Sequence, residues 1–344
     1  MQQDPSDHEP QAGGPSRRRH ERGDLGASMK ATRQDFERQV KATRGDIERQ
    51  MQATKAQFDA TSERIQARTG RNLILAILIG VGLGLLIVAS LIIVKELFLV
   101  LGLALLGFAS FELAGALRGA GWLVPRIPTV VSALAVVPAT YYGGSTGQLV
   151  SVGAGIVFVS LWRLAELTMR SHRASAASVM RDLGAGVLIQ IYVVFLGSFA
   201  ILLLAQEHGQ WWLLGSLIVV VAVDTGAYVS GLLFGKHPMA PVISPKKTWE
   251  GFAGAAVASI IAGILLATLM MGEPVWFGFI LGPVLLLTAT MGDLAESLIK
   301  RDLGIKDMSS WLPGHGGFLD RLDSILPSAA AAFALFVVFA GLKV

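Results

Sequence analysis

The chain has 344 residues, of which 53% are hydrophobic and only 16% are charged, and its formal net charge is +4. A soluble chain of this length would not sustain repeated apolar runs of about 20 residues, the length that crosses the core of a bilayer. The composition therefore excludes an ordinary soluble globular protein. Because the chain contains no cysteine, disulfides and thiolate metal sites are excluded as well.

The first part of the chain is polar and precedes the apolar runs. Residues 1–28 are rich in Pro, Gly and Arg, which predicts a disordered tail. Residues 29–71 contain an eleven-residue repeat whose apolar positions recur at steps of three or four, which predicts a cytoplasmic amphipathic helix. This period favours a slightly right-handed supercoil of associated helices. The alternatives are a helix lying on the membrane surface and a solvated, partly helical linker.

Residues 72–344 form the predicted transmembrane domain, with about nine apolar spans. The spans are 72–94, 97–117, 126–142, 147–165, 184–204, 211–233, 251–271, 275–293 and 325–342. The third and fourth are short. The pattern predicts an all-α, polytopic integral membrane protein, with polar candidate residues concentrated in 211–344.

Lysine and arginine are distributed unequally between the predicted loops. With the N-terminus in the cytoplasm, the outer segments hold only Lys95 and Lys343, whereas the inner loops hold many more. Since short cytoplasmic loops carry an excess of these residues, the pattern predicts a multi-pass protein of the plasma (inner) membrane with its N-terminus and polar loops in the cytoplasm.

The densest polar stretch of the chain is residues 297–323. Charged side chains beside a membrane are costly, so such a cluster indicates a functional site. Cations can bind phosphates, carboxylates can bind a hard metal ion, and Gly316-Gly317 lets the backbone approach a ligand. The cations are Lys300, Arg301, Lys306 and Arg321, and the carboxylates are Asp302, Asp307, Asp320 and Asp323. The alternative is a solvated loop with unrelated ion pairs.

Helical spacing groups some of these residues. Asp320 and Asp323 lie three residues apart and would share one side of a helix. Asp293 would share a helix face with Glu296, Ser297 and Lys300, and its alternative reading is a carboxylate paired with Lys300.

Two features lie further upstream. Asp224 interrupts an apolar run, where a carboxylate is rarely tolerated without a partner. It could bind a ligand or make a buried structural hydrogen bond. Lys246 and Lys247 are expected to open the seventh helix, where lysines and backbone N–H groups can bind phosphate together. Ordinary positive charge in a cytoplasmic loop is the alternative.

The polar stretch resembles the signature of CDP-diacylglycerol synthases (phosphatidate cytidylyltransferases). The matching residues are Ser297, Lys300-Arg301, Lys306-Asp307, Pro313-x-His315-Gly316-Gly317 and Asp320-Arg321-x-Asp323. The resemblance continues upstream through Asp224-x-x-Ala227-Tyr228, 244–251 and Gly292-Asp293-x-x-Glu296. It covers the chain from roughly Asn72 onward, and Glu112 matches a family acidic position whose role stays open.

The resemblance implies an enzyme of phospholipid biosynthesis that makes CDP-diacylglycerol and pyrophosphate from CTP and phosphatidate. It implies Mg²⁺, with a second cation left open, and it supports Asp293 and Asp320 as the leading ligands, with Asp323 next. A salt bridge to an arginine is the alternative for Asp323. Lys300 and Arg301 are further catalytic candidates. The substrate-binding candidates are Asp224, Lys246, Lys247, Lys306, His315, Gly316, Gly317 and Arg321. The implied partners are CTP, phosphatidate and membrane lipid, without nucleic acid, and a homodimer is left open.

Two other functions compete with this reading. A CTP-dependent lipid kinase would share the membrane and the nucleotide but would transfer the γ-phosphoryl group. A transporter would also carry intramembrane carboxylates, but it predicts charges deep in several spans and an inverted repeat. The charges of this sequence instead gather on one face, and no such repeat is visible.

Overall fold

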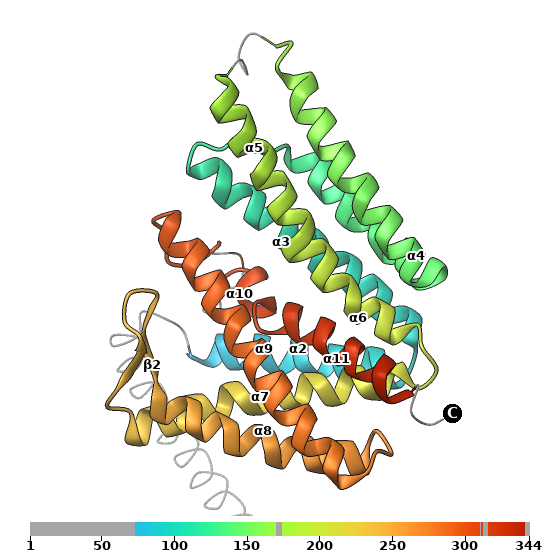
Figure 1. The fold of residues 1–344 in the computed structure, drawn as a ribbon, viewed down its shortest axis with the longest axis vertical. Coiled ribbons are helices and arrows are strands. Elements are labelled where there is room, and N and C mark those ends of the chain that lie inside the picture. The colour runs from blue at the N-terminus through green and yellow to red at the C-terminus, as the bar shows by residue number, and fades with distance from the viewer. Residues whose placement is uncertain (1–72, 170–173, 310, 312–315, 341–344) are drawn as a thin grey trace, which may run out of the picture. The chain divides into compact units, whose positions relative to one another are not determined.

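The computed structural model describes residues 73–169, 174–309, 311 and 316–340. The polar tail and the repeat helix expected in residues 1–71 lie outside the described residues. The described part is mainly helical (Figure 1). Its elements are α2 (Leu73–Ile92), α3 (Lys95–Gly119), α4 (Arg126–Glu166), α5 (Ala176–Ile189), the π-helix η2 (Gln190–Phe195), α6 (Leu196–Leu204), α7 (Gly209–Phe234), β1 (Pro238–Ala240), β2 (Ser244–Thr248), α8 (Trp249–Leu269), α9 (Val275–Asp302), α10 (Leu319–Leu322) and α11 (Ile325–Ala340).

Seven helical segments among the described residues are long and apolar enough to cross a membrane. A helix rises about 1.5 Å per residue, so about 20 residues span the hydrocarbon core. The segments are Lys95–Gly119, Arg126–Glu166, Ala176–Leu204, Gly209–Phe234, Trp249–Leu269, Val275–Asp302 and Leu319–Phe339. The protein is therefore a helical, multi-pass membrane protein. The count of nine spans stays a prediction.

Helix α4 shows how two expected spans can share one helical segment. It runs through both 126–142 and 147–165, and its backbone breaks at Gly144, which has φ 59° and ψ −150°. Only glycine adopts such a conformation readily, because it has no Cβ to clash. The break separates two helical stretches at the place where the sequence pattern separates its third and fourth spans.

The residues before α8 correct one expectation. Lys246 and Lys247 do not open a helix; they lie in β2, which pairs antiparallel with β1. Helix α8 begins only at Trp249, after Thr248, whose Oγ1 accepts a hydrogen bond of 3.1 Å from the Gly251 backbone N–H. Threonine is a favourable residue at this capping position. A small hairpin thus interrupts the expected all-α architecture and carries the two lysines.

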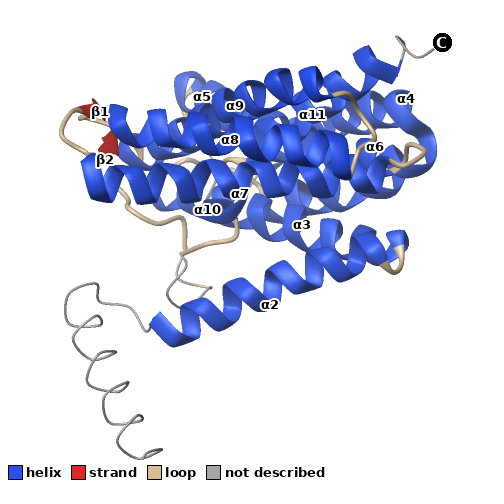
Figure 2. Ribbon diagram, turned by 90° about the horizontal axis from the view of Figure 1, so that it is seen from below, coloured by secondary structure: helices blue, strands red, loops and turns tan. Residues whose placement is uncertain are grey.

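Helices α7, α8 and α9 pack closely because small residues lie where they meet. A Cβ added at Gly278 of α9 would lie 2.4 Å from the Ile264 Cα of α8. A Cβ at Gly226 of α7 would lie 2.7 Å from the Ala258 Cβ of α8. Small residues allow backbones to approach in membrane helices, where van der Waals packing drives association. Figure 2 shows α7 and α8 running side by side, with the hairpin at one end of the pair.

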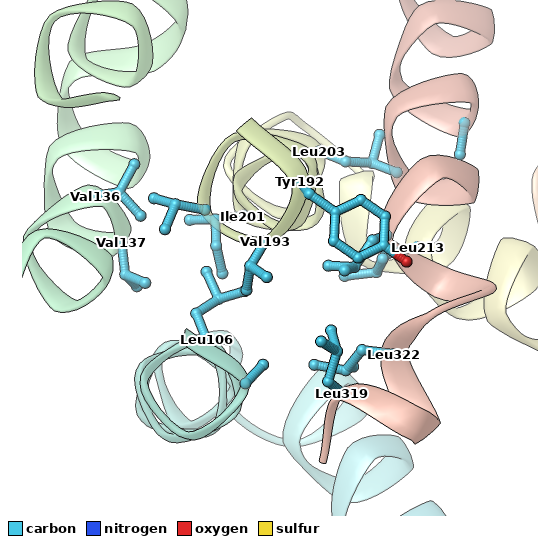
Figure 3. Close-up of a cluster of buried hydrophobic side chains, with 14 of the residues drawn as sticks. Leu106, Val136, Val137, Tyr192, Val193, Ile201, Leu203, Leu213, Leu319 and Leu322 are labelled. Carbon is cyan, nitrogen blue, oxygen red and sulfur yellow. The ribbon is translucent and has the colours of Figure 1, made fainter. Parts of the chain in front are cut away.

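A buried apolar cluster joins the two halves of the described chain. It combines side chains of α3, α4, η2, α6, α7 and α10, as the close-up in Figure 3 shows. Among them, Leu319 and Leu322 are both buried, at 0% and 8% exposure, although α10 is only four residues long. These two leucines anchor α10 in the core, and they flank Asp320 and Arg321 in the sequence.

Candidate active site

A cavity of about 450 Å³ opens between α7, the hairpin, α8, α9 and the α10–α11 segment. Its apolar lining comes mainly from α7 and α8, and its charged lining comes from every element except α8. The charged residues on the cavity wall are Asp224, Lys246, Lys247, Asp293, Asp320, Arg321 and Asp323. Charged residues from four separate segments therefore converge on one cavity at one end of the helices, an arrangement typical of a binding site for a polar ligand.

Asp293 and Asp323 lie on adjoining backbone segments. A Cβ added at Gly292 would lie 2.2 Å from the Asp323 carbonyl oxygen, so only glycine fits between α9 and the end of α10. The Asp293 carboxylate pairs with the Lys247 Nζ at 2.5 Å and accepts a 3.3 Å hydrogen bond from the Ser297 hydroxyl. The expected alternative, a pair between Asp293 and Lys300, is wrong. The glycine contact places two carboxylates on the same stretch of cavity wall.

Lys300 lies in a buried network beside the cavity. Its Nζ contacts the Glu296 Oε2 at 2.6 Å and the Asp320 Oδ1 at 2.8 Å. The two carboxylate side chains are 0% and 6% exposed. The Asp320 Oδ2 accepts further hydrogen bonds from the backbone N–H groups of Gly317 at 2.7 Å and Met308 at 3.1 Å. Asp320 is therefore fixed on one side while it lines the cavity on the other.

The hairpin is held in place at its base and near its tip. The Glu250 Oε2 accepts hydrogen bonds from the backbone N–H groups of Lys236 and His237, at 3.1 and 3.2 Å. The Arg301 Nε donates a 3.2 Å hydrogen bond to the Ile243 carbonyl oxygen. These contacts orient β2, which brings Lys246 and Lys247 to the cavity wall.

The structure separates the sequence-predicted site residues into groups. The seven charged residues named above line the cavity. Lys300 does not line it but forms an ion pair with Asp320, which does. Arg301 binds the hairpin, and Lys306 is exposed and does not line the cavity. Gly316 has φ +79°, and a Cβ there would lie 2.7 Å from the Asp320 Oδ2. His315 lies outside the described residues. The roles predicted for all of them stay predictions.

The donor set of the cavity suits a hard cation that also binds a substrate. Within the described residues, no group of three or more acidic or histidine side chains is gathered closely enough to hold a metal ion alone. Magnesium, however, is usually bound by one or two carboxylates, with substrate phosphates and water completing its six oxygen ligands. Asp293 and Asp323, adjoining on the wall, fit this requirement.

Two residues that line the cavity, Thr290 and Ser324, are not among those predicted from the sequence. The sequence placed Glu296 on the helix face of Asp293 and Lys300, but it did not predict that Glu296 pairs with Lys300. Thr290 lies three residues before Asp293, so helical spacing could have found it. The contact between Lys247 and Asp293 carries no local signal, because it joins a strand to a distant helix.

A second cavity, of about 640 Å³, lies at the opposite ends of α7 and α8. Its described lining includes Glu207 and Glu273 and contains neither lysine nor arginine. The smaller cavity combines three cationic side chains with its carboxylates. Because a polyphosphate needs cations nearby, the smaller cavity is the better candidate for an anionic substrate.

Comparisons with known proteins agree with this choice of chemistry. A model of the cytidylyltransferase family matches residues 74–339. The chain is 42% identical over 277 residues to the phosphatidate cytidylyltransferase of Mycobacterium bovis, covering 79% of this chain and 90% of that protein. It is likewise 42% identical over 277 residues to that of Mycobacterium tuberculosis, and 42% identical over 279 residues to that of Mycobacterium leprae. These alignments cover 79% of this chain and 84% and 89% of the two relatives.

Proposed function

Because this chain belongs to the cytidylyltransferase family of CDP-diacylglycerol synthases and is a CTP-using nucleotidyltransferase, we propose that it joins CTP to phosphatidate. The products are CDP-diacylglycerol and pyrophosphate. The observation that carries the proposal is the cavity in which Lys246, Lys247 and Arg321 face four aspartates at one end of the membrane helices.

The proposed reaction transfers the cytidylyl group of CTP to phosphatidate, and both reactants are anions. An ionised phosphate oxygen of phosphatidate forms a bond to the α-phosphorus of CTP. The bond from this phosphorus to the oxygen bridging to the β-phosphate breaks, and its electron pair leaves with pyrophosphate. No general base is needed, because the attacking oxygen is already ionised. The protein must therefore reduce repulsion between the reactants and stabilise the leaving group.

We assign these two tasks to different side chains of the cavity. Lys246, Lys247 and Arg321 would contact the phosphates of the substrates. Asp293 and Asp323 would hold Mg²⁺, with Asp320 as the third candidate ligand. When bound, the cation supplies positive charge to the phosphate oxygens and the leaving pyrophosphate.

We further propose that the protein lies in the plasma membrane and that the cavity faces the cytoplasm, which contains CTP. The cavity ends of α7, α8 and α9 carry Lys236, Lys246, Lys247, Lys300 and Arg301. The loops at their opposite ends, 205–208 and 270–274, contain no lysine or arginine. Cytoplasmic loops are enriched in these residues, which supports this orientation.

Labelled CTP tests the proposed reaction directly. The purified protein is incubated in detergent with phosphatidate, Mg²⁺ and CTP that carries its label on either the α- or the γ-phosphate. We expect the α-label in the lipid product and one pyrophosphate released per lipid formed. The γ-label in the lipid would show a kinase. Either that result or no lipid labelling by folded protein would contradict the proposal. Diacylglycerol in place of phosphatidate is the matched control and should remain unlabelled.

A further inference from the structure

Glu112 is a buried carboxylate in the C-terminal third of α3, a membrane helix that contributes no lining to the candidate active site. Its exposure is 3%. A carboxylate in such a position is costly unless hydrogen bonds compensate for the lost water. The contacts that Glu112 makes therefore indicate why it is there.

Both carboxylate oxygens of Glu112 bind the polar segment that precedes and begins α10. The Ser309 hydroxyl donates a 2.5 Å hydrogen bond to Oε1, and the Leu319 backbone N–H donates a 2.9 Å hydrogen bond to Oε2. The two donors lie 197 and 207 residues from Glu112 in sequence. One side chain thus fixes two points of the chain that are ten residues apart.

The neighbours of Glu112 on α3 contact the same segment through aromatic rings. Phe111 stacks on Trp311 with ring centroids 5.4 Å apart, and Phe108 stacks on Phe318 at 4.8 Å. Such pairs are favourable beyond the area they bury. Helix α3 therefore contacts Ser309, Trp311, Phe318 and Leu319 through one carboxylate and two aromatic side chains.

Gly317 explains how the backbone comes so near to Glu112. A Cβ added at Gly317 would lie 2.7 Å from the Glu112 Oε2 and 2.8 Å from its Oε1, closer than real contacts allow. The Gly317 N–H in turn donates to the Asp320 Oδ2 at 2.7 Å. Gly317 thus lies between Glu112 and Asp320 in space, and Asp320 in turn lines the cavity.

We infer that Glu112 is a positioning residue for Asp320: through Ser309, Gly317 and Leu319 it sets where the Asp320 carboxylate lies on the cavity wall. This inference rests on the proposed function, because it assumes that Asp320 acts in the cytidylyl transfer. The hydrogen bonds of Glu112 go to Ser309 and Leu319, and neither of these residues lines the cavity. Glu112 therefore acts on the geometry of the site and not on the substrate.

Three variants on α3 test the inference. In Glu112→Ala, both hydrogen bonds are lost, and since a misplacement of about 1 Å can cost about a hundredfold in rate, kcat should fall by about that factor. In Glu112→Gln, Oε1 can accept from Leu319 N–H while the amide donates to the Ser309 hydroxyl, so kcat should stay within about tenfold of wild type. The matched control is Ser110→Ala on the same helix, because the buried Ser110 hydroxyl has no hydrogen-bond partner among the described residues. It should retain full activity.

Two readouts separate positioning from general destabilisation. The loss in Glu112→Ala should appear in kcat, with the KM for CTP changed much less. Hydrogen exchange of a peptide covering 316–323 should become faster in Glu112→Ala and remain slow in Glu112→Gln and Ser110→Ala. The exchange measurement needs no substrate, so it tests the inference even if the wild-type protein does not make CDP-diacylglycerol.

Several results would overturn the inference. One is wild-type kcat in Glu112→Ala. Another is a Glu112→Gln variant that is well folded yet as impaired as Glu112→Ala, since the negative charge would then matter more than the two hydrogen bonds. Unchanged hydrogen exchange at 316–323 in Glu112→Ala would also contradict it. If Glu112→Ala does not fold, Ser309→Ala takes its place. Ser309→Ala should lower kcat, and Ser110→Ala remains the control with unchanged kcat.

Discussion

Replacing Lys300 by methionine should destabilise the protein strongly, because it leaves two buried carboxylates without their shared cation. Lys300 is 15% exposed, and its Nζ contacts Glu296 at 2.6 Å and Asp320 at 2.8 Å. Removing one partner of a buried ion pair costs about 3–5 kcal/mol. Asp320 keeps its backbone hydrogen bonds from Gly317 and Met308, which limits the expected loss to the lower end of that range, about 3 kcal/mol.

The assay is the free energy of unfolding in mixed detergent micelles, measured for Lys300→Met, for Glu296→Gln and for the double variant. The double variant should be more stable than Lys300→Met alone, because one of the two unpaired charges is gone. Lys236→Met is the matched control, since this lysine is exposed and should leave stability unchanged. A loss below about 1 kcal/mol in Lys300→Met, the value of an exposed pair, would show that Lys300 does not hold a buried ion pair. A double variant less stable than Lys300→Met would show the same.

Three further predictions concern the cavity and the N-terminal part of the chain. Asp293→Asn should fold normally and lose at least about a hundredfold in kcat at saturating Mg²⁺, as removal of one charge-stabilising group typically does; substantial turnover would exclude an essential cation-binding role. Replacing both Lys246 and Lys247 by alanine should raise the KM for CTP by about tenfold or more, because charge-assisted hydrogen bonds to phosphate are lost; an unchanged KM would show that these lysines do not bind the nucleotide. Deleting residues 1–68 should leave most of the turnover intact in detergent, and a folded but inactive truncation would place part of the site in that segment.

The membrane helices and most of the charged residues that line the candidate site could be predicted from local patterns and motifs. Apolar runs of about 20 residues marked the spans, and the spacing of Asp320 and Asp323 placed them on one side of a helical segment, which begins at Leu319. The expected helix at Lys246 was wrong because the pairing of β2 with β1 depends on a second strand that is only three residues long. Such a short strand has no recognisable periodicity.

Contacts between distant parts of the chain could not be predicted. Helical spacing left a pair between Asp293 and Lys300 open as an alternative, whereas the structure pairs Asp293 with Lys247, and Lys300 with Glu296 and Asp320. All these partners were visible in the sequence, but their distances depend on how α9 packs against the hairpin and α10. The role of Glu112 was hidden for the same reason, since its partners lie about 200 residues away.

Crosslinking with a photoreactive CTP analogue tests whether CTP binds in the cavity between the hairpin and α9. Crosslinked peptides are identified by mass spectrometry, with excess CTP as competitor. We expect labels that excess CTP removes in peptides covering 244–251 or 286–301, which include Lys246, Lys247 and Asp293. Competed labels confined to 205–212 or 270–277, beside the larger acidic cavity, would contradict it.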